Sequence, residues 1–327
     1  MARLFFPGQR LVALALLCFP IALSASPAKL ETVSLYGNRY VSLRDWARVK
    51  GFSFQWDKPN KTVLLTNRWA KLTFLANSKR TTLNGLSFWI SSPITVSGAS
   101  VFIAERDLDK TIHPILYPEK LSPGKRVRTI LIAAGHGGKD PGYEINKEQE
   151  KKYTLLMAKA LKEALVAAGF RVMLSRETDV FIDLPAQAAQ ANRVKADLFI
   201  TIHYNAAVDR EPNGVETYCL TPAGATSTNG GSPTPKSPGH RQDGFNPLLA
   251  YQIHKSLTSN CAFQDRGIRR AGFQVLREIT MPGVLIEGGF LSNPVDAKKI
   301  TSAAHRSTAA RAIVDGILSY KRLVERK

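Results

Sequence analysis

The sequence predicts an α/β fold whose main part is a mainly parallel, twisted sheet with helices on both faces, preceded by a small α+β domain. After residue 129, apolar runs rich in β-branched residues alternate with segments whose apolar residues recur at helical spacing. This order of strand, helix and strand is typical of a parallel sheet. Before residue 117 the pattern changes to short strands, short helices and turns, and this part contains all four tryptophans.

The first residues predict a secretory signal peptide over residues 1–25. Arg3 and Arg10 precede an apolar run over residues 11–23, and small residues follow at 24–26. The run falls short of the ~20 apolar residues that span a bilayer. We therefore expect export to the periplasm or cell envelope, and no transmembrane segment in the mature chain. Cys18 would permit lipid attachment, but the bulky Leu17 before it disfavours this.

The chain is strongly basic, with a formal net charge of +19 that falls to +17 once Arg3 and Arg10 leave with the signal peptide. Such a protein concentrates at polyanions. Because an exported protein does not normally meet nucleic acid, we expect anionic envelope polymers, lipid head groups or peptidoglycan carboxylates as partners, and no nucleic acid. Cys219 and Cys261 remain in the mature chain, and the sequence leaves open whether they pair or stay buried thiols.

Residues 28–116 are predicted to form the small α+β accessory domain. Two stretches in it, residues 40–46 and 101–108, echo each other, since each extended stretch runs into a helix-like segment. The pattern loosely resembles the small domain found at the N-terminus of copper amine oxidases. Its tryptophans are expected in a core rather than on a sugar-binding face. This domain is also where we expect an activator or another envelope protein to bind. Turn signals lie at Gly37-Asn38, Lys58-Pro59-Asn60 and Asn84-Gly85.

A proline-containing linker over residues 117–128 leads to the larger domain, residues 129–327. Residues 222–247 of this domain are rich in Gly, Ser, Thr and Pro, which predicts a mobile surface loop. The predicted strands are the apolar runs 129–134, 170–175, 197–202, 214–220 and 283–287. The predicted helices have apolar residues at helical spacing over 153–168, 184–195, 246–258 and 303–324.

Two histidines lie at matching places in this pattern. His136 follows the first predicted strand in the turn GHGGKDPG, and His203 follows the strand DLFITI. Because the ends of adjacent parallel strands lie side by side, both imidazoles can point into one crevice at the carboxyl edge of the sheet. A hydrolytic zinc commonly takes two His and one Glu. Glu150 is placed to be that third ligand, although Glu144 and Glu148 compete on position, and an acidic residue is also favoured at any helix N-terminus.

A second acidic residue, Glu287, ends the apolar strand GVLIE and precedes GGFLSN. Burial of an unpaired carboxylate is costly and favours either a partner or a raised pKa. A carboxylate beside a metal-bound water is the usual general base and acid of zinc hydrolases. Each residue alone is weak evidence, whereas two strand-end histidines with a strand-end glutamate predict a catalytic metal site.

The motifs GHGGKDPG, EKKYTLLMAKAL, DLFITIHYNAA, GVETYCL, DRGIRRAGFQVLR and MPGVLIEGGFLSN resemble, in order and spacing, those of the zinc-dependent N-acetylmuramoyl-L-alanine amidase family. The resemblance covers residues 129 to about 320. It implies zinc held by His136, Glu150 and His203, with Glu287 as general base and acid. A metal-bound water would then be the nucleophile that cleaves the amide between the muramic acid lactyl group and L-alanine of peptidoglycan.

The sequence departs from the family pattern in two ways. Ala133-Ala134 stands where the family often has Asp-Pro, which removes no ligand, and residues 222–247 resemble an insertion that could gate or widen the substrate groove. One alternative is a non-catalytic peptidoglycan-binding or regulatory envelope protein of the same fold, and another is hydrolysis of a different amide of the wall. The sequence has no GxSxG elbow and no GxxxxGK[ST] phosphate loop, and GHGGKDPG lacks the GxGxxG spacing of dinucleotide sites.

Overall fold

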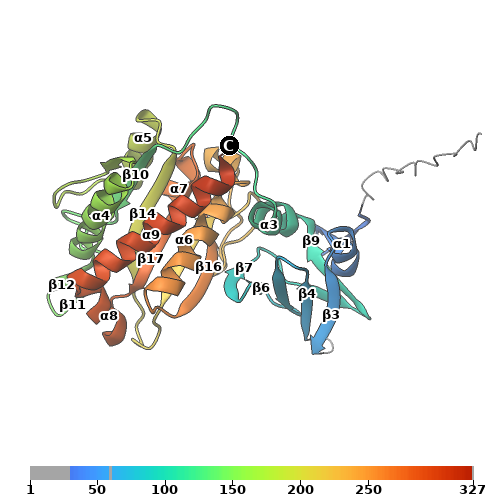
Figure 1. Ribbon diagram of the computed structural model, residues 1–327. Helices are drawn as coiled ribbons and strands as arrows, with labels where there is room; N and C mark the ends of the chain where they lie inside the picture. Colours follow the sequence, from blue (N-terminus) through green and yellow to red (C-terminus); the bar gives the residue numbers. More distant parts are fainter. Residues whose placement is uncertain (1–29, 59–60, 326–327) are drawn as a thin grey trace, which may run out of the picture.

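The computed structural model describes residues 30–58 and 61–325 (Figure 1). The predicted signal peptide, residues 1–25, and part of the turn signal Lys58-Pro59-Asn60 therefore lie outside the described residues. Within the described ranges, no helix has both the length and the apolar composition needed to cross a membrane.

A long twisted sheet organises the C-terminal part of the chain. Its strand order is β13-β10-β14-β17-β15-β16, and the first four strands are parallel to one another. β15 runs antiparallel to β17, and β16 is parallel to β15. The mainly parallel α/β fold that the sequence predicts is thus confirmed. The strands are β10 (Thr129–Ala134), β13 (Arg171–Leu174), β14 (Leu198–Asn205), β15 (Val215–Leu220), β16 (Asp265–Ala271) and β17 (Gly283–Phe290).

Two of these strands are longer than their apolar runs predict. β14 continues to Asn205, so His203 lies inside a strand rather than after it, and β17 continues to Phe290, so Glu287 lies inside its strand rather than at the end. The strand β16 was not among the predicted strands, because its sequence DRGIRRA has too many charges to look like a buried strand. The arginine side chains on β16 are nevertheless largely buried, because they form the ion pairs and hydrogen bonds described below.

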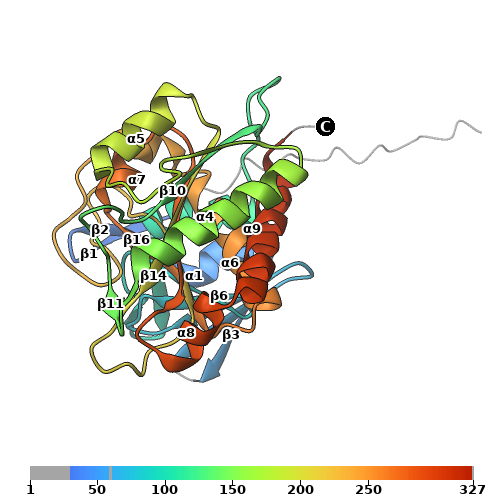
Figure 2. The same ribbon diagram turned by 90° about the vertical axis from the view of Figure 1, so that its left-hand side faces the viewer.

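Helices cover both faces of this sheet (Figures 1 and 2). One face packs against α4, α6 and α9, with Leu161, Ile253 and Ile317 among their buried residues. The other face has a separate apolar cluster that includes Ala188 of α5 and Leu276 of α7. The helices are α4 (Glu150–Ala167), α5 (Leu184–Arg193), α6 (Asn246–Asn260), α7 (Gln274–Glu278), α8 (Pro294–Thr301) and α9 (Ala303–Val324), and a short hairpin of β11 (Glu144–Ile145) and β12 (Glu148–Gln149) precedes α4.

Residues 30–116, called the N-terminal region below, form an α+β unit as predicted. One four-stranded sheet has the order β1-β2-β9-β8, and an antiparallel meander has the order β7-β6-β5-β4-β3. The strands are β1 (Thr32–Leu35), β2 (Asn38–Ser42), β3 (Ser53–Lys58), β4 (Thr62–Thr66), β5 (Lys71–Leu75), β6 (Arg80–Leu83), β7 (Leu86–Trp89), β8 (Thr95–Ser97) and β9 (Ser100–Ala104). The helices are α1 (Leu43–Val49), α2 (Glu105–Asp107), the π-helix η1 (Leu108–Ile112) and α3 (His113–Leu116).

The tryptophans of the N-terminal region differ in exposure. Trp46 is fully buried, stacks on Phe52 and donates from its Nε1 to His113 Nε2 at 2.9 Å. Trp69, in contrast, is 74% exposed. The expectation of tryptophans in a core therefore holds for Trp46 and not for Trp69.

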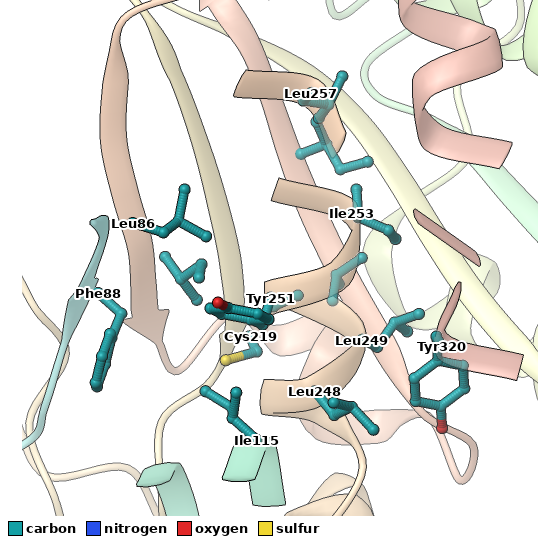
Figure 3. Packing of buried hydrophobic residues seen from close by; sticks show 14 of the residues in the cluster. Leu86, Phe88, Ile115, Cys219, Leu248, Leu249, Tyr251, Ile253, Leu257 and Tyr320 are labelled. Carbon is teal, nitrogen blue, oxygen red and sulfur yellow. The ribbon is translucent and has the colours of Figure 1, made fainter. Parts of the chain in front are cut away.

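The N-terminal region and the C-terminal part share one continuous core. β7 pairs in parallel with β16, where Phe88 lies opposite Ile268, so the meander extends the larger sheet to eleven strands within the described residues. Figure 3 shows Leu86 and Phe88 of β7 and Ile115 of α3 close to Cys219 of β15 and to α6. Residues 117–128, the predicted linker, contain no helix or strand, and Leu121 N donates to Val324 O at the end of α9.

Cys219 and Cys261 are both buried and free, so of the two alternatives the structure has buried thiols.

Residues 222–247 contain a 3-10 helix, η2 (Pro238–Gln242), and a hydrogen bond from Thr228 N to Arg270 O connects them to β16. Because β15 is antiparallel to β17, this segment leaves β15 near the amino end of β17. There, Gln242 Nε2 donates to Thr280 O at 2.8 Å. The segment therefore lies at the opposite edge of the sheet from the carboxyl ends of β10 and β14, which contradicts the expectation that it gates or widens a substrate groove there.

Candidate active site

The turn after β10 places His136 at the carboxyl edge of the sheet, the end near β11, β12 and α8 in Figure 1. His136 has a φ of +61°, an uncommon conformation for a residue with a side chain. Its Nδ1 lies 2.8 Å from Asp140 Oδ2, and Asp140 is held in the turn by two backbone hydrogen bonds with Gly137. A hydrogen bond at one ring nitrogen orients the imidazole, which leaves Nε2 to face the crevice.

Glu150 is the first residue of α4 and is only 4% exposed. Its Oε2 lies 3.0 Å from His136 Nε2, and its Oε1 lies 3.3 Å from His203 Nδ1. The backbone N–H groups of Tyr143 and Tyr204 also donate to this carboxylate. Glu150, rather than a competitor, is thus the acidic residue that meets both histidines.

The two competitors point to other partners. Glu148 accepts hydrogen bonds from Lys152 and Tyr153, and Glu144 accepts one from Gln149. In the part of the chain that the structure describes, His136, Glu150 and His203 form the group that could hold a metal ion. Their ligand atoms all lie within 4.8 Å of one another.

Two glycines make room for this group. A Cβ atom on Gly135 would lie 2.3 Å from His203 Cε1, and one on Gly142 would lie 2.6 Å from Glu150 Oε2. Gly142 also has a φ of +67°, a conformation that glycine adopts at little cost. The glycines of GHGGKDPG therefore permit close approach of a turn to a side-chain cluster, rather than a phosphate cradle.

Charge stabilises this arrangement. Burial alone would raise the pKa of Glu150, but hydrogen bonds and charges from His136 and His203 outweigh burial and hold the pKa well below its usual value. Burial alone would lower the pKa of His136, but Glu150 and Asp140 together raise it. Glu150 is therefore a carboxylate at neutral pH, and two nitrogens and a carboxylate are a donor set that suits zinc.

Glu287 lies beside this group on the neighbouring strand. In the parallel pairing of β14 with β17, Glu287 is opposite His203. Its Oε2 is buried and has no hydrogen-bond partner among the described residues. Burial raises the pKa of Glu287 well above its usual value, and the negative charges of Glu150 and Glu216 raise it further. The structure thus brings all four predicted site residues together, and among them the carboxyl group of Glu287 retains a proton readily.

A fifth residue, Glu216, did not enter the sequence prediction. It is 2% exposed and lies opposite Glu287 in the antiparallel pairing of β15 with β17. Arg266 and Arg269 of β16 pair with its Oε1 at 2.8 and 3.2 Å. The single charged residue in the otherwise uncharged strand GVETYCL was the signal that could have found it.

Arg176 is a second residue that the sequence prediction missed. Its guanidinium is buried under the turn that holds His136, and it donates to Ala134 O, Gly135 O and Lys151 O. One side chain thereby ties the end of β10 to the first turn of α4. We find no sequence signal for it, because its partners are backbone carbonyls of distant residues.

A family model described as N-acetylmuramoyl-L-alanine amidase matches residues 130–319, more than half of the chain. The chain belongs to the N-acetylmuramoyl-L-alanine amidase family. A second model, described as copper amine oxidase N-terminal domain, matches residues 25–112. Both family resemblances that the sequence suggested are confirmed.

Relatives within the amidase family include LytC of Bacillus subtilis, which is 37% identical over 194 residues. That alignment covers 59% of this chain and 36% of LytC, so this chain spans about a third of that protein. AmiA of Escherichia coli is 31% identical over 254 residues, which cover 69% of this chain and 87% of AmiA. The catalytic domain of the amidase CwlV from Bacillus (Paenibacillus) polymyxa var. colistinus is 31% identical with a TM-score of 0.51, over 60% of this chain and 99% of that one.

Proposed function

We propose that this protein is a zinc-dependent N-acetylmuramoyl-L-alanine amidase, which hydrolyses the amide between the lactyl group of muramic acid and L-alanine in peptidoglycan. The observation that carries the proposal is the convergence of His136, Glu150 and His203, with the carboxyl group of Glu287 on the next strand. This arrangement combines a metal-ligand set with an adjacent proton carrier, which is one arrangement that hydrolyses an unactivated amide. Membership of the amidase family supports the same reaction.

The residues fit zinc on the chemistry of their donors. His136 and His203 each offer a ring nitrogen, and Glu150 offers a carboxylate that is already oriented by two backbone N–H groups. Three protein ligands of this kind leave a position for water or substrate, as in other hydrolytic zinc sites. When bound, zinc supplies Lewis-acid chemistry, since it lowers the pKa of water and polarises a carbonyl oxygen.

Glu287 is the proton carrier in this proposal. With zinc bound, the nearby positive charge would favour the ionised form of Glu287. Its carboxylate then accepts a proton from the water that attacks the scissile carbonyl, and its carboxyl group donates that proton to the departing nitrogen of L-alanine. Burial of its Oε2 without a hydrogen-bond partner leaves that oxygen available for this exchange. The products are a muramic acid carboxylate on the glycan and a stem peptide with a free amino end.

Export to the periplasm or cell envelope, which the basic and apolar start of the chain predicts, would bring the enzyme to its substrate. We divide the chain into an accessory domain over residues 28–116, a linker over 117–128 and the amidase domain over 129–327. The accessory domain packs on β16 through β7, so it is a candidate site for an activator that acts on the catalytic sheet.

The test is release of stem peptides from purified peptidoglycan by the mature protein, with and without a zinc chelator. We expect chelator-sensitive release of peptides with free L-alanine amino ends, and loss of release in Glu287→Gln. Glu144→Gln, which changes an exposed carboxylate near the site, is the matched control and should keep full activity. Cleavage within the glycan or at peptide cross-links would overturn the choice of bond. A zinc-loaded but inert wild type would point to a missing activator or to the binding-protein alternative.

A further inference from the structure

A second pocket lies between the N-terminal region and the segment after β15. It has a volume of about 510 Å³, which is within the range of small-molecule sites. Its walls come from separate stretches of chain: the turn before β2, the connection between β5 and β6, the residues before β8, and α2. A fifth stretch, Gly224–Thr226, belongs to the C-terminal part. The pocket therefore exists only because the two parts of the chain pack together.

The lining of this pocket is cationic and polar. Lys79 and Arg106 are both half-buried in it, and the lining contains no aspartate or glutamate. Within the described ranges neither cation has an acidic partner, and Lys79 Nζ donates only to Thr226 Oγ1 at 3.3 Å. The other lining residues supply amide and hydroxyl groups, among them Asn38 and Asn77. Two partly desolvated cations without a counter-charge favour an anionic ligand, and the amides and hydroxyls suit the hydroxyl groups of a sugar.

An aromatic side chain completes the rim. Tyr36 is 83% exposed and lines the pocket, although it occupies a turn at φ +50°, where glycine or asparagine is usual. At this exposure its ring adds little to the stability of the fold. An exposed aromatic ring beside polar groups is a surface on which the apolar face of a sugar ring can pack.

This pocket is distinct from the candidate active site. Gly224–Thr226 follow Leu220, the last residue of β15. Because β15 is antiparallel to β17, this end of β15 lies near the amino end of β17. The group of His136, Glu150 and His203 lies at the carboxyl edge of β10 and β14. A ligand in this pocket would therefore anchor the protein rather than enter the reaction.

We propose that this pocket binds peptidoglycan glycan from which the stem peptide has been removed, through the carboxylate of muramic acid. This inference rests on the proposed function, because amide hydrolysis is what frees that carboxylate while the glycan keeps its sugar hydroxyls. Lys79 and Arg106 pair with the carboxylate, and Tyr36 packs on a sugar ring. The pocket thereby retains the enzyme on wall that it has already processed.

Binding is measured by calorimetry with the disaccharide N-acetylglucosaminyl-N-acetylmuramic acid, whose lactyl carboxylate is free. We expect it to bind roughly tenfold or more tightly than the neutral disaccharide diacetylchitobiose, since hydrogen bonds to a charged group are the stronger ones. Lys79→Ala/Arg106→Ala should weaken binding by a similar factor. The matched control Lys61→Ala/Lys71→Ala removes the same charge from exposed positions of the same region and should leave binding unchanged.

Equal binding of both disaccharides, or equal loss in both double variants, would overturn the proposal in favour of unspecific attraction to a basic protein. Tighter binding of a glycerol phosphate polymer than of the muramic acid disaccharide would overturn it in favour of a phosphate ligand. If Lys79→Ala/Arg106→Ala does not fold, Tyr36→Ala serves in its place, because the exposed Tyr36 ring has little packing to lose.

Catalysis is scored separately on a soluble muramyl peptide. We expect both double variants to hydrolyse it as fast as the wild type, while Lys79→Ala/Arg106→Ala is slower on intact sacculi. Hydrolysis without disaccharide binding would refute the pocket proposal and leave the amidase proposal standing. Absence of hydrolysis with intact disaccharide binding would refute the amidase proposal instead.

Discussion

Glu216 and Glu287 lie directly opposite each other on the antiparallel strands β15 and β17, although Glu216 is buried and the Oε2 atom of Glu287 is buried as well. The two differ in their partners. Glu216 pairs with Arg266 and Arg269 and accepts from Tyr218, whereas Glu287 Oε2 has no hydrogen-bond partner in the described structure. Burial raises the pKa of Glu287, and the negative charges of Glu150 and Glu216 raise it further.

Glu216→Gln should shift the pH dependence of the reaction. Loss of the Glu216 charge frees Arg266 and Arg269, and both changes favour the ionised form of Glu287. The pKa of Glu287 therefore falls, and the limb of the kcat profile that reports Glu287 moves to lower pH. We expect kcat on the plateau above this limb to fall by roughly tenfold, because a carboxylate with a lower pKa is a weaker base toward the attacking water. Glu211→Gln, at an exposed position, is the control, and an unmoved profile in Glu216→Gln would contradict this role.

Glu287→Gln should separate catalysis from metal binding. Glutamine has nearly the same shape but cannot accept and return a proton, so we expect kcat to fall by about 10²–10⁴. Zinc content should stay at the wild-type level, because the ligand group does not include Glu287. Metal analysis of the purified variant beside the kinetic assay provides the check. Loss of zinc together with activity would mean that Glu287 is itself a ligand.

Glu150→Gln should affect both metal binding and stability. The carboxylate is 4% exposed and accepts from two histidines and two backbone N–H groups. An amide group can accept at one atom only, so at least one buried donor loses its partner, at a cost of about 1–3 kcal/mol in unfolding free energy. We expect chelation to lower the Tm of the wild type and to leave the Tm of the variant unchanged. A variant that still binds zinc as tightly as the wild type would rule out Glu150 as a ligand.

Sequence patterns predicted the strands and helices well where apolar residues dominate. The buried run TILIAA became β10 with the same bounds, because a strand covered on both faces excludes polar residues. β16 was missed because Arg266, Arg269 and Arg270 are covered only through partners on other elements. The direction of β15, and hence the position of residues 222–247, depends on pairing between strands far apart in sequence, which local patterns do not encode.

The site followed the same rule. His136, His203 and Glu287 were predicted because strand ends of a parallel sheet converge. Position alone left Glu144 and Glu148 as alternatives to Glu150, and the family resemblance selected Glu150. Glu216 and Arg176 were not found, because each acts through partners that only the folded chain brings near. The pocket beside Lys79 and Arg106 is of this second kind, since its walls come from both parts of the chain.

Asp265→Asn should destabilise the contact between β7 of the N-terminal region and the C-terminal sheet. Asp265 accepts from Ser87 N of β7 and lies 2.9 Å from His254 Nε2 of α6, whose Nδ1 lies 3.0 Å from Thr217 Oγ1. Asparagine offers one acceptor atom in place of two, so either Ser87 N or His254 Nε2 loses its hydrogen-bond partner. We expect an unfolding free energy lower by about 1–3 kcal/mol, measured by denaturant titration. Asp315→Asn, an exposed position on α9, is the control and should change stability by less than about 0.5 kcal/mol.

The acid dependence of this effect has a defined sign. Burial alone would raise the pKa of Asp265, but hydrogen bonds from His254 and Ser87 outweigh burial and hold it below its ordinary value. A carboxyl group with a lowered folded-state pKa stabilises the protein above its unfolded pKa of about 3.9, and this contribution is lost as the pH falls through the folded value. The stability difference between wild type and Asp265→Asn should therefore be constant from neutral pH to about pH 5 and shrink below about pH 4. A difference that grows on acidification would show that the variant acts through another group.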